Sequence, residues 1–216
     1  MREALIAGGA CLVGFADVSN LNTDVAKEYP FGICFALRYD RDAVEQLPSD
    51  DCFIQMSSKL SSRAKKLYRI CTDILSGWGY RYKRITSATP ADDLKDLSEE
   101  LPQKTLATLS GLGWIGKSAL LVSPEFGPRI RLGTILTHGA LIVDAPITFG
   151  RCKDCTACVD ACPAGAITGA EWSQGIARRE LLDAFLCNQH LCETKQSLGR
   201  RQTCGICVRV CPFGRN

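Results

Sequence analysis

Four closely spaced cysteines near the carboxyl end constrain this chain more than any other feature. The stretch CKDCTACVDACP places Cys152, Cys155, Cys158 and Cys162 in the spacing C-x2-C-x2-C-x3-C-P. This run is typical of proteins with two 4Fe–4S clusters, where three thiolates bind one cluster and the fourth, before proline, binds the other. Structural zinc sites prefer two separated CxxC pairs. The run therefore predicts iron–sulfur chemistry.

A second, incomplete cysteine run ends the chain. CGICVRVCP supplies three more thiols, so the two runs together hold seven of the eight ligands that two cubanes need. The eighth must come from Cys187 or Cys192, and spacing alone leaves that choice open. Crossing the runs, as bacterial two-cluster ferredoxins do, gives two ligand sets. Cluster one would be bound by Cys152, Cys155, Cys158 and Cys211. Cluster two would be bound by Cys162, Cys204, Cys207 and the inserted cysteine.

The cysteines also indicate where the chain divides. Nine of the thirteen lie in the last 65 residues. The other four, Cys11, Cys34, Cys52 and Cys71, lie singly in apolar stretches, where a cysteine is usually a small buried hydrophobe. Basic residues outnumber acidic ones by 9 to 6 from Arg151 onward, and the two are equal before it, so the net charge of +3 lies in the cysteine-rich part. We predict two domains, residues 1–150 and residues 151–216.

Hydrophobic periodicity predicts an α+β fold for the first of these domains. Apolar residues recur at helical spacing from Ser57 to Trp78, which gives the longest predicted helix, and shorter helices are predicted over residues 2–9 and 102–111. Strands are predicted over residues 11–18, 33–39, 80–86, 119–123 and 129–137, the last two joined by the turn PEFGP. The predicted fold is a mixed or antiparallel sheet domain with helices, followed by a bacterial ferredoxin-like domain with two 4Fe–4S clusters.

A glycine-rich stretch, GLGWIGKSALL from Gly111 to Leu121, matches two nucleotide-binding patterns, GxGxxG and GxxxxGKS. The run ALIVD that ends at Asp144 even offers something like the second NTPase motif. A phosphate loop, however, needs a strand before the glycines and a helix after them, so that the helix N-terminus faces the phosphates. The predicted order here is helix, glycine turn, strand. We therefore do not expect an NTPase.

The amino terminus, MREALIAGGACLVGFAD, has an apolar run but not a typical export signal, because Glu3 interrupts the basic leader. No stretch reaches the roughly 20 apolar residues of a membrane span. The prediction is a cytoplasmic chain with no membrane partner and with reduced thiols, which also disfavours disulfides.

Two stretches together resemble one enzyme family. With TLATLSGLGWIGKSALLVSPEFGPRIRLGTILT followed by CKDCTACVDACPAGAI, the chain resembles the epoxyqueuosine reductases, distant relatives of reductive dehalogenases that carry a cobalamin and two 4Fe–4S clusters. The resemblance implies Cys187 as the eighth cluster ligand. It also implies that the glycine turn helps to build a corrinoid pocket. The residues concerned are Gly111, Gly113, Trp114, Gly116, Lys117 and Ser118.

The chain departs from that family in two ways. Members that act on tRNA continue into a helical-repeat domain, whereas this sequence stops at Asn216, so we expect a short form that does not bind tRNA. Members also have an aspartate ahead of the glycine turn, and the resemblance implies that it is the proton donor. This chain has Thr86 or Ser87 at the corresponding place, with Asp92 and Asp93 nearby. No catalytic residue is assigned.

Two pairs of residues are further candidates to move a proton or bind a metal. Tyr80 and Tyr82 lie on a predicted strand, where packing is the simpler role. His138 lies in a predicted turn and His190 beside Cys187, and a surface role is the simpler one for both.

Two functions remain open. The first is a corrinoid-dependent iron–sulfur reductase that receives electrons from a donor such as a flavodoxin or a ferredoxin. The alternative is a two-cluster electron carrier, or a reductive activator of a partner corrinoid protein, without substrate chemistry of its own. The excess basic charge suits either function, because it stabilises anionic clusters and attracts an acidic partner.

Overall fold

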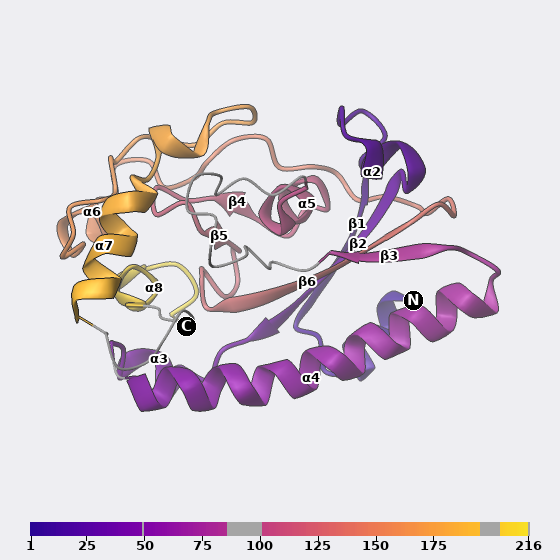
Figure 1. The fold of residues 1–216 in the computed structure, drawn as a ribbon, viewed down its shortest axis with the longest axis horizontal. Helices are drawn as coiled ribbons and strands as arrows, with labels where there is room; N and C mark the ends of the chain where they lie inside the picture. Colours follow the sequence, from indigo (N-terminus) through magenta and orange to yellow (C-terminus); the bar gives the residue numbers. More distant parts are fainter. Residues whose placement is uncertain (49, 86–100, 195–203, 216) are drawn as a thin grey trace. The chain divides into compact units, whose positions relative to one another are not determined.

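The computed structural model describes residues 1–48, 50–85, 101–194 and 204–215, which form two compact units made of interleaved segments (Figure 1). The first unit comprises Met1–Arg38, Leu60–Leu112 and Arg131–Ile147. The second comprises Tyr39–Lys59, Gly113–Ile130 and Thr148–Asn216. The second unit therefore contains the cysteine-rich end together with two earlier segments, Tyr39–Lys59 and Gly113–Ile130.

A four-stranded sheet forms the centre of the first unit, in the order β1-β2-β6-β3. The strands are β1 (Leu12–Asp17), β2 (Phe31–Arg38), β3 (Tyr82–Ile85) and β6 (Ile130–Thr137). β1 is antiparallel to β2, and β3 is antiparallel to β6. β2 is buried on both faces because helices cover both sides of the sheet. The predicted α+β class with antiparallel pairing is confirmed.

The helices α1 (Arg2–Ala7), α4 (Asp50–Gly77) and α5 (Gln103–Leu109) frame this sheet (Figure 1). On the α4 side, the rings of Phe35 and Tyr68 meet edge to face at 5.0 Å, and the backbone N–H of Thr134 donates to the Tyr68 hydroxyl. On the α5 side, a Cβ on Gly14 would lie 2.2 Å from the Ser110 carbonyl oxygen. The lack of a side chain at Gly14 therefore lets α5 approach the sheet.

Two short helices and one helix start were not predicted from the sequence. α2 (Asp24–Glu28) begins at Thr23, whose hydroxyl accepts from the backbone N–H of Ala26, and α3 (Arg41–Glu45) begins at Asp40, whose carboxylate accepts from that of Ala43. α4 begins at Asp50 rather than at Ser57. Local capping residues account for both short helices.

The second unit contains short elements. They are β4 (Trp114–Ile115), β5 (Leu121–Val122), α6 (Ala157–Asp160), the 3-10 helix Arg178–Glu180, α7 (Ala184–Thr194) and α8 (Ile206–Val210), together with α3. The turn PEFGP forms, with Ser123 bridged to Gly127. However, β5 pairs with β4, whereas β6, the strand that follows the turn, belongs to the four-stranded sheet. Within the described ranges, no helix has the length and apolar character needed to cross a membrane.

Candidate iron–sulfur site

The first cysteine run lies on a tight loop followed by one helical turn. The backbone N–H of Cys155 donates to the Cys152 carbonyl at 3.0 Å, and Lys153 between them has a φ of +50°, which is rare for a residue other than glycine. Cys158 lies in α6, where the Thr156 hydroxyl donates to the Asp160 carboxylate at 2.7 Å. These local hydrogen bonds shape the loop and the helical turn, and the four cysteines of the run are half-buried.

The second run is built around α8. Gly205 precedes this helix with a φ of +73°, and a Cβ there would lie 2.7 Å from the Leu47 side chain. Cys204 stands before the turn, Cys207 lies within the helix and Cys211 follows its last residue. A side chain larger than hydrogen at Gly205 would strain the turn and meet Leu47.

The two candidates for the eighth ligand both lie on α7. The Asp183 carboxylate starts this helix by accepting from the backbone N–H groups of Phe185 and Leu186, each at 3.0 Å. Cys187 is half-buried near its start, whereas Cys192 is exposed near its end and lies 3.8 Å from the Asn188 amide nitrogen. The structure therefore distinguishes two cysteines that spacing alone could not.

The electrostatic neighbours of the half-buried thiols fall into two groups. Burial raises the pKa of Cys158 to about 11, and the further contributions come from Cys152, Cys211 and Cys155. These four are the residues predicted for cluster one.

The second group contains the other predicted set and overlaps the first. Burial raises the pKa of Cys207 to about 12, and the further contributions come, largest first, from Cys204, from Cys158 of the first group, and from Cys187 and Cys162. Burial likewise raises the pKa of Cys187, followed by Cys162 and Cys204.

Eight thiols gathered in this way fit an iron–sulfur group. Crowded, half-buried thiols resist ionisation, and the positive charge of bound iron offsets that cost. Among the described residues, no three His, Cys, Asp or Glu side chains are placed to hold a single metal ion. A cubane does not need such convergence, because each cysteine binds a different iron.

The glycine motif of the sequence lies against the first cysteine run. The order around it is helix α5, glycine turn, strand β4, as predicted. The indole N–H of Trp114 donates to the Cys152 sulfur at 3.5 Å, and the Lys117 ammonium donates to the Lys153 carbonyl at 2.6 Å. A Cβ on Gly116 would lie 3.5 Å from the same sulfur.

The other members of the motif are held by the chain itself. Gly111 belongs to the first unit and has a φ of +71°. A Cβ on Gly113 would lie 2.2 Å from the Val122 carbonyl oxygen, and Ser118 is buried. The contacts described for this motif are with the cluster loop and with neighbouring backbone, and its predicted contact with a corrinoid stays a prediction.

One functional side chain was not predicted from the sequence. Arg129 is only 4% exposed, and its guanidinium donates to the backbone carbonyls of Phe213 at 2.5 Å, Cys211 at 2.8 Å and Arg209 at 2.9 Å. Burial lowers the pKa of this guanidinium, and the Cys211 thiolate acts in the opposite direction. The only local signal is a charged residue directly after Pro128, at the start of an apolar strand.

The remaining candidates have structural partners. His138 Nδ1 accepts from the backbone N–H of Arg81, and His190 is half-buried on α7. Asp144, from the run ALIVD, pairs with Arg2 at 2.7 Å and accepts from the backbone N–H of Phe15.

Four residues considered as proton donors, Thr86, Ser87, Asp92 and Asp93, lie outside the described residues.

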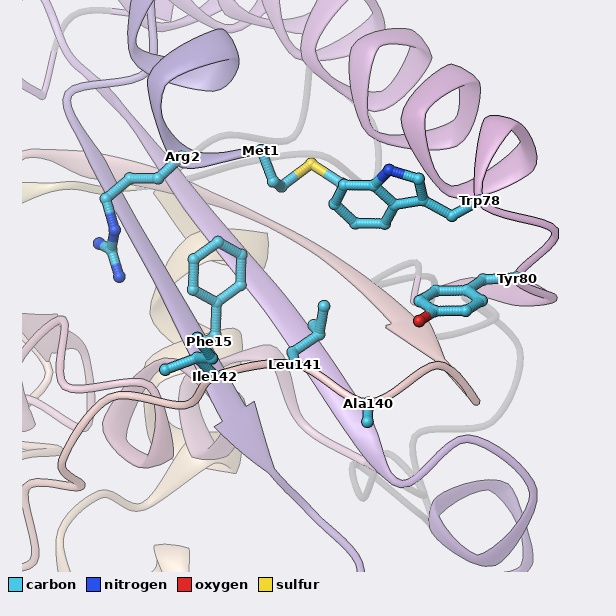
Figure 2. Close-up of a pocket in the computed structure, with 8 residues that line it drawn as sticks. All are labelled: Met1, Arg2, Phe15, Trp78, Tyr80, Ala140, Leu141 and Ile142. Atoms are coloured by element: carbon cyan, nitrogen blue, oxygen red, sulfur yellow. The ribbon is translucent and has the colours of Figure 1, made fainter.

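A groove of about 590 Å³ lies in the first unit (Figure 2). None of the proposed cluster ligands is among the residues that line it. Its walls are mainly apolar, with Phe15 from β1, Trp78 and Tyr80 from the connection between α4 and β3, and Ile142. Arg2 at its rim is already paired with Asp144. The groove supplies the phenol of Tyr80 as a polar group, but no thiol.

Comparison with known proteins supports the iron–sulfur assignment. Residues 151–214 match the family described as 4Fe-4S double cluster binding domain. An epoxyqueuosine reductase of Listeria monocytogenes is 31% identical over 125 residues, which are 54% of this chain and 30% of that protein. The chain thus spans about a third of the length of such curated relatives. The predicted binding of two 4Fe–4S clusters is confirmed at the level of the domain.

Solved structures show the same fold. An epoxyqueuosine reductase solved with an epoxyqueuosine-modified tRNA-Tyr stem loop has a TM-score of 0.63 at 20% identity, covering 99% of this chain and 64% of that one. A reductive dehalogenase, whose structure suggests a mechanism for B12-dependent dehalogenation, has a TM-score of 0.74 at 18% identity, covering 99% and 31%. The predicted resemblance to epoxyqueuosine reductases and reductive dehalogenases is confirmed.

Proposed function

We propose that this chain is an iron–sulfur reductase that passes electrons through two 4Fe–4S clusters to a bound corrinoid and on to a substrate. The observation that supports this proposal is the gathering of eight half-buried thiols in the second unit. The proposed ligands of cluster one are Cys152, Cys155, Cys158 and Cys211. Those of cluster two are Cys162, Cys187, Cys204 and Cys207.

We assign the proposed roles according to the predicted domains, residues 1–150 and residues 151–216. Residues 151–216 supply every cluster ligand, and residues 1–150 supply the corrinoid and substrate side. The corrinoid rests on the relatives, one of which is described by a B12-dependent mechanism. When bound, such a group would supply a redox-active cobalt centre. The protein's share is to keep the clusters away from water and to hold their thiolates ionised.

The proposed electron donor is a low-potential protein such as a flavodoxin or a ferredoxin. Cys187 contributes to cluster two from α7, where the neighbouring Phe185 and Leu186 side chains are 63% and 44% exposed. Burial raises the pKa of the Cys187 thiol, and the exposed Arg178 opposes that rise. An apolar patch with basic residues close to a cluster suits docking of an acidic redox protein.

The same patch also supports the second candidate function, an electron carrier or reductive activator that delivers its electrons to a partner protein. The two functions differ in whether cobalt binds to this chain. Metal analysis therefore separates them.

The test is anaerobic reconstitution of the full chain with iron, sulfide and cobalamin. A reductase should hold about eight irons and one cobalt per chain, with a changed corrinoid spectrum. About eight irons without cobalt would favour the carrier, and absence of iron would overturn both. The tRNA stem loop recognised by the related structure should be offered as one substrate, beside small halogenated aromatic compounds.

A matched cysteine pair on α7 tests the ligand assignment. Cys187→Ser should reduce the iron content to about four per chain, because one cubane loses a ligand, whereas Cys192→Ser should leave about eight. The reverse result would move the eighth ligand to Cys192.

A further inference from the structure

The hairpin segment Gly113–Ile130 carries two buried cations into the cysteine-rich unit. Lys117 is 7% exposed and Arg129 is 4% exposed. Among the described residues, neither side chain forms an ion pair with a carboxylate. The Glu45 carboxylate acts on Arg129 from beyond ion-pair distance. A buried charge that is not directly paired is costly, so an anionic group close to these two cations would be stabilised.

Each cation binds the backbone of a different ligand segment of cluster one. The Lys117 ammonium donates to the carbonyl of Lys153, inside the Cys152–Cys155 loop. The Arg129 guanidinium donates to three carbonyls around Cys211, 80 to 84 positions later in the chain. The hairpin segment therefore holds both ends of the cluster-one ligand set.

Close backbone packing also joins the hairpin segment to the end of the chain after Cys211. A Cβ on Gly127 would lie 2.0 Å from the Phe213 carbonyl oxygen, and one on Gly214 would lie 2.0 Å from the Phe126 carbonyl carbon. Both glycines have positive φ angles, +57° and +70°. The Trp114 ring, which also contacts Cys152, meets the Phe213 ring edge to face at 5.0 Å.

The charges near cluster two are different. Among the described residues, a cation that acts on one of its thiols is Arg178, which is exposed and affects Cys187. Water screens an exposed charge strongly, whereas a buried charge is screened much less. Positive charge and N–H donors near a cluster favour its reduced, more negative form. The two clusters therefore experience unequal fields.

We propose that the hairpin segment is a clamp that positions Cys211 and raises the reduction potential of cluster one above that of cluster two. This inference rests on the proposed function, since it requires both clusters. With both clusters bound and cluster two reduced by a low-potential protein donor, such a difference would favour transfer of one electron to cluster one, which would be reduced while cluster two would be reoxidised. Arg129 and Lys117 are positioning residues in this scheme.

The experiment is a redox titration of the anaerobically purified full chain, followed by electron paramagnetic resonance, with iron analysis. Cys187→Ser removes cluster two and so identifies the signal of cluster one. In the native protein, cluster one should have the higher midpoint potential. Arg129→Met should lower that potential and leave cluster two unchanged, or should release cluster one and reduce the iron content from about eight to about four.

Two further variants separate charge from position. Arg129→Lys keeps the charge, so the reduction potential of any cluster one that is retained should stay close to native. A lysine cannot bridge three carbonyls, so the iron of cluster one should be lost more readily. Arg215→Met is the matched control. Arg215 is exposed and donates to two of the same carbonyls, those of Cys211 and Arg209, and its replacement should change neither potential nor iron content.

The outcomes are distinct. Native potentials and about eight irons in Arg129→Met would overturn the clamp, as would an equal shift in Arg215→Met. If Arg129→Met loses both clusters, Lys117→Met decides, because a lower cluster-one potential supports the proposal and an unchanged one refutes it. If the native chain binds no iron, the proposed function itself fails.

Discussion

The two units are stabilised by different means. In the first, a four-stranded sheet lies between helices, and large side chains such as Phe35, Leu106 and Ile135 are fully buried. In the second, regular elements are short, eight cysteines are half-buried, and two cations are buried without carboxylate partners among the described residues. The comparison indicates that apolar packing holds the first unit and that bound metal completes the second.

Removal of iron should produce the largest difference between the units. Metal-binding free energy acts as folding free energy where ligands are brought together only by the metal, so a chelator should reduce protection in the second unit by more than about 4 kcal/mol. Amides of α8 and of the segment near Ile167 should exchange rapidly, while those of β1 and β2 stay protected. Hydrogen exchange by mass spectrometry measures this, and simultaneous loss in both units would contradict the comparison.

A core truncation in the first unit should have the next largest effect. Leu106 on α5 has no exposed surface, so Leu106→Ala should lower the free energy of unfolding by about 3 kcal/mol, through lost burial and the cavity left behind. Hydrogen exchange of the β1 and β2 amides in increasing denaturant measures the unfolding of this unit.

Iron content should be unchanged in Leu106→Ala. Leu186→Ala is the control, since Leu186 is 44% exposed and should change stability by no more than about 0.5 kcal/mol. Loss of iron in the Leu106 variant would show that the units do not behave separately.

Alkaline pH should weaken the first unit through a thiol unrelated to the clusters. Burial raises the pKa of Cys34 to about 11, opposed by hydrogen bonds from Thr134 and Ser110. Because the folded state keeps this proton longer than the unfolded chain, its stabilising effect is complete below about pH 9 and is lost as the pH rises through 11. The loss amounts to about 2–3 kcal/mol.

The measurement is the free energy of unfolding against pH in the native protein and in Cys34→Ala. The difference between the two should shrink as the pH rises, because only the native protein loses this contribution. Parallel curves would show that Cys34 does not titrate in this way.

The smallest expected effects come from two matched helix caps, one in each unit. Thr23→Ala removes the cap of α2 in the first unit, and Asp40→Ala removes that of α3 in the second. Each should cost about 1 kcal/mol. Hydrogen exchange should place each loss in its own unit, and Asp40→Ala should weaken iron retention more than Thr23→Ala does.

Local patterns were enough to predict much of the fold and the thiols. Alternation gave β1, β2 and β6 to within a few residues, and helical periodicity gave most of α4, because each pattern is set by neighbouring residues facing one core. The fixed cysteine spacing likewise reports local loop geometry. The pairing of β5 with β4 could not be predicted from local patterns. A turn sequence shows where the chain reverses but does not specify which strands form hydrogen bonds with each other.

Arg129 shows why the rest of the site was not predictable. Its three acceptors are backbone carbonyls, which every residue possesses, and they lie 80 to 84 positions away in the sequence. No residue type marks such a contact. The choice of Cys187 over Cys192 had a similar limit, because only the three-dimensional surroundings show that one is half-buried and the other exposed.

The interleaving of the two units limits how this protein can be divided or exchanged. A fragment cut at residue 150 would keep all eight proposed ligands and the whole matched cluster domain, yet it would lack Trp114, Lys117 and Arg129. Such a fragment would keep the ferredoxin-type cysteine runs but lose the side chains that contact them in the full chain. Recombination that transplants only the contiguous cluster segment would therefore move the proposed ligands and leave behind side chains that contact their backbone and the Cys152 sulfur.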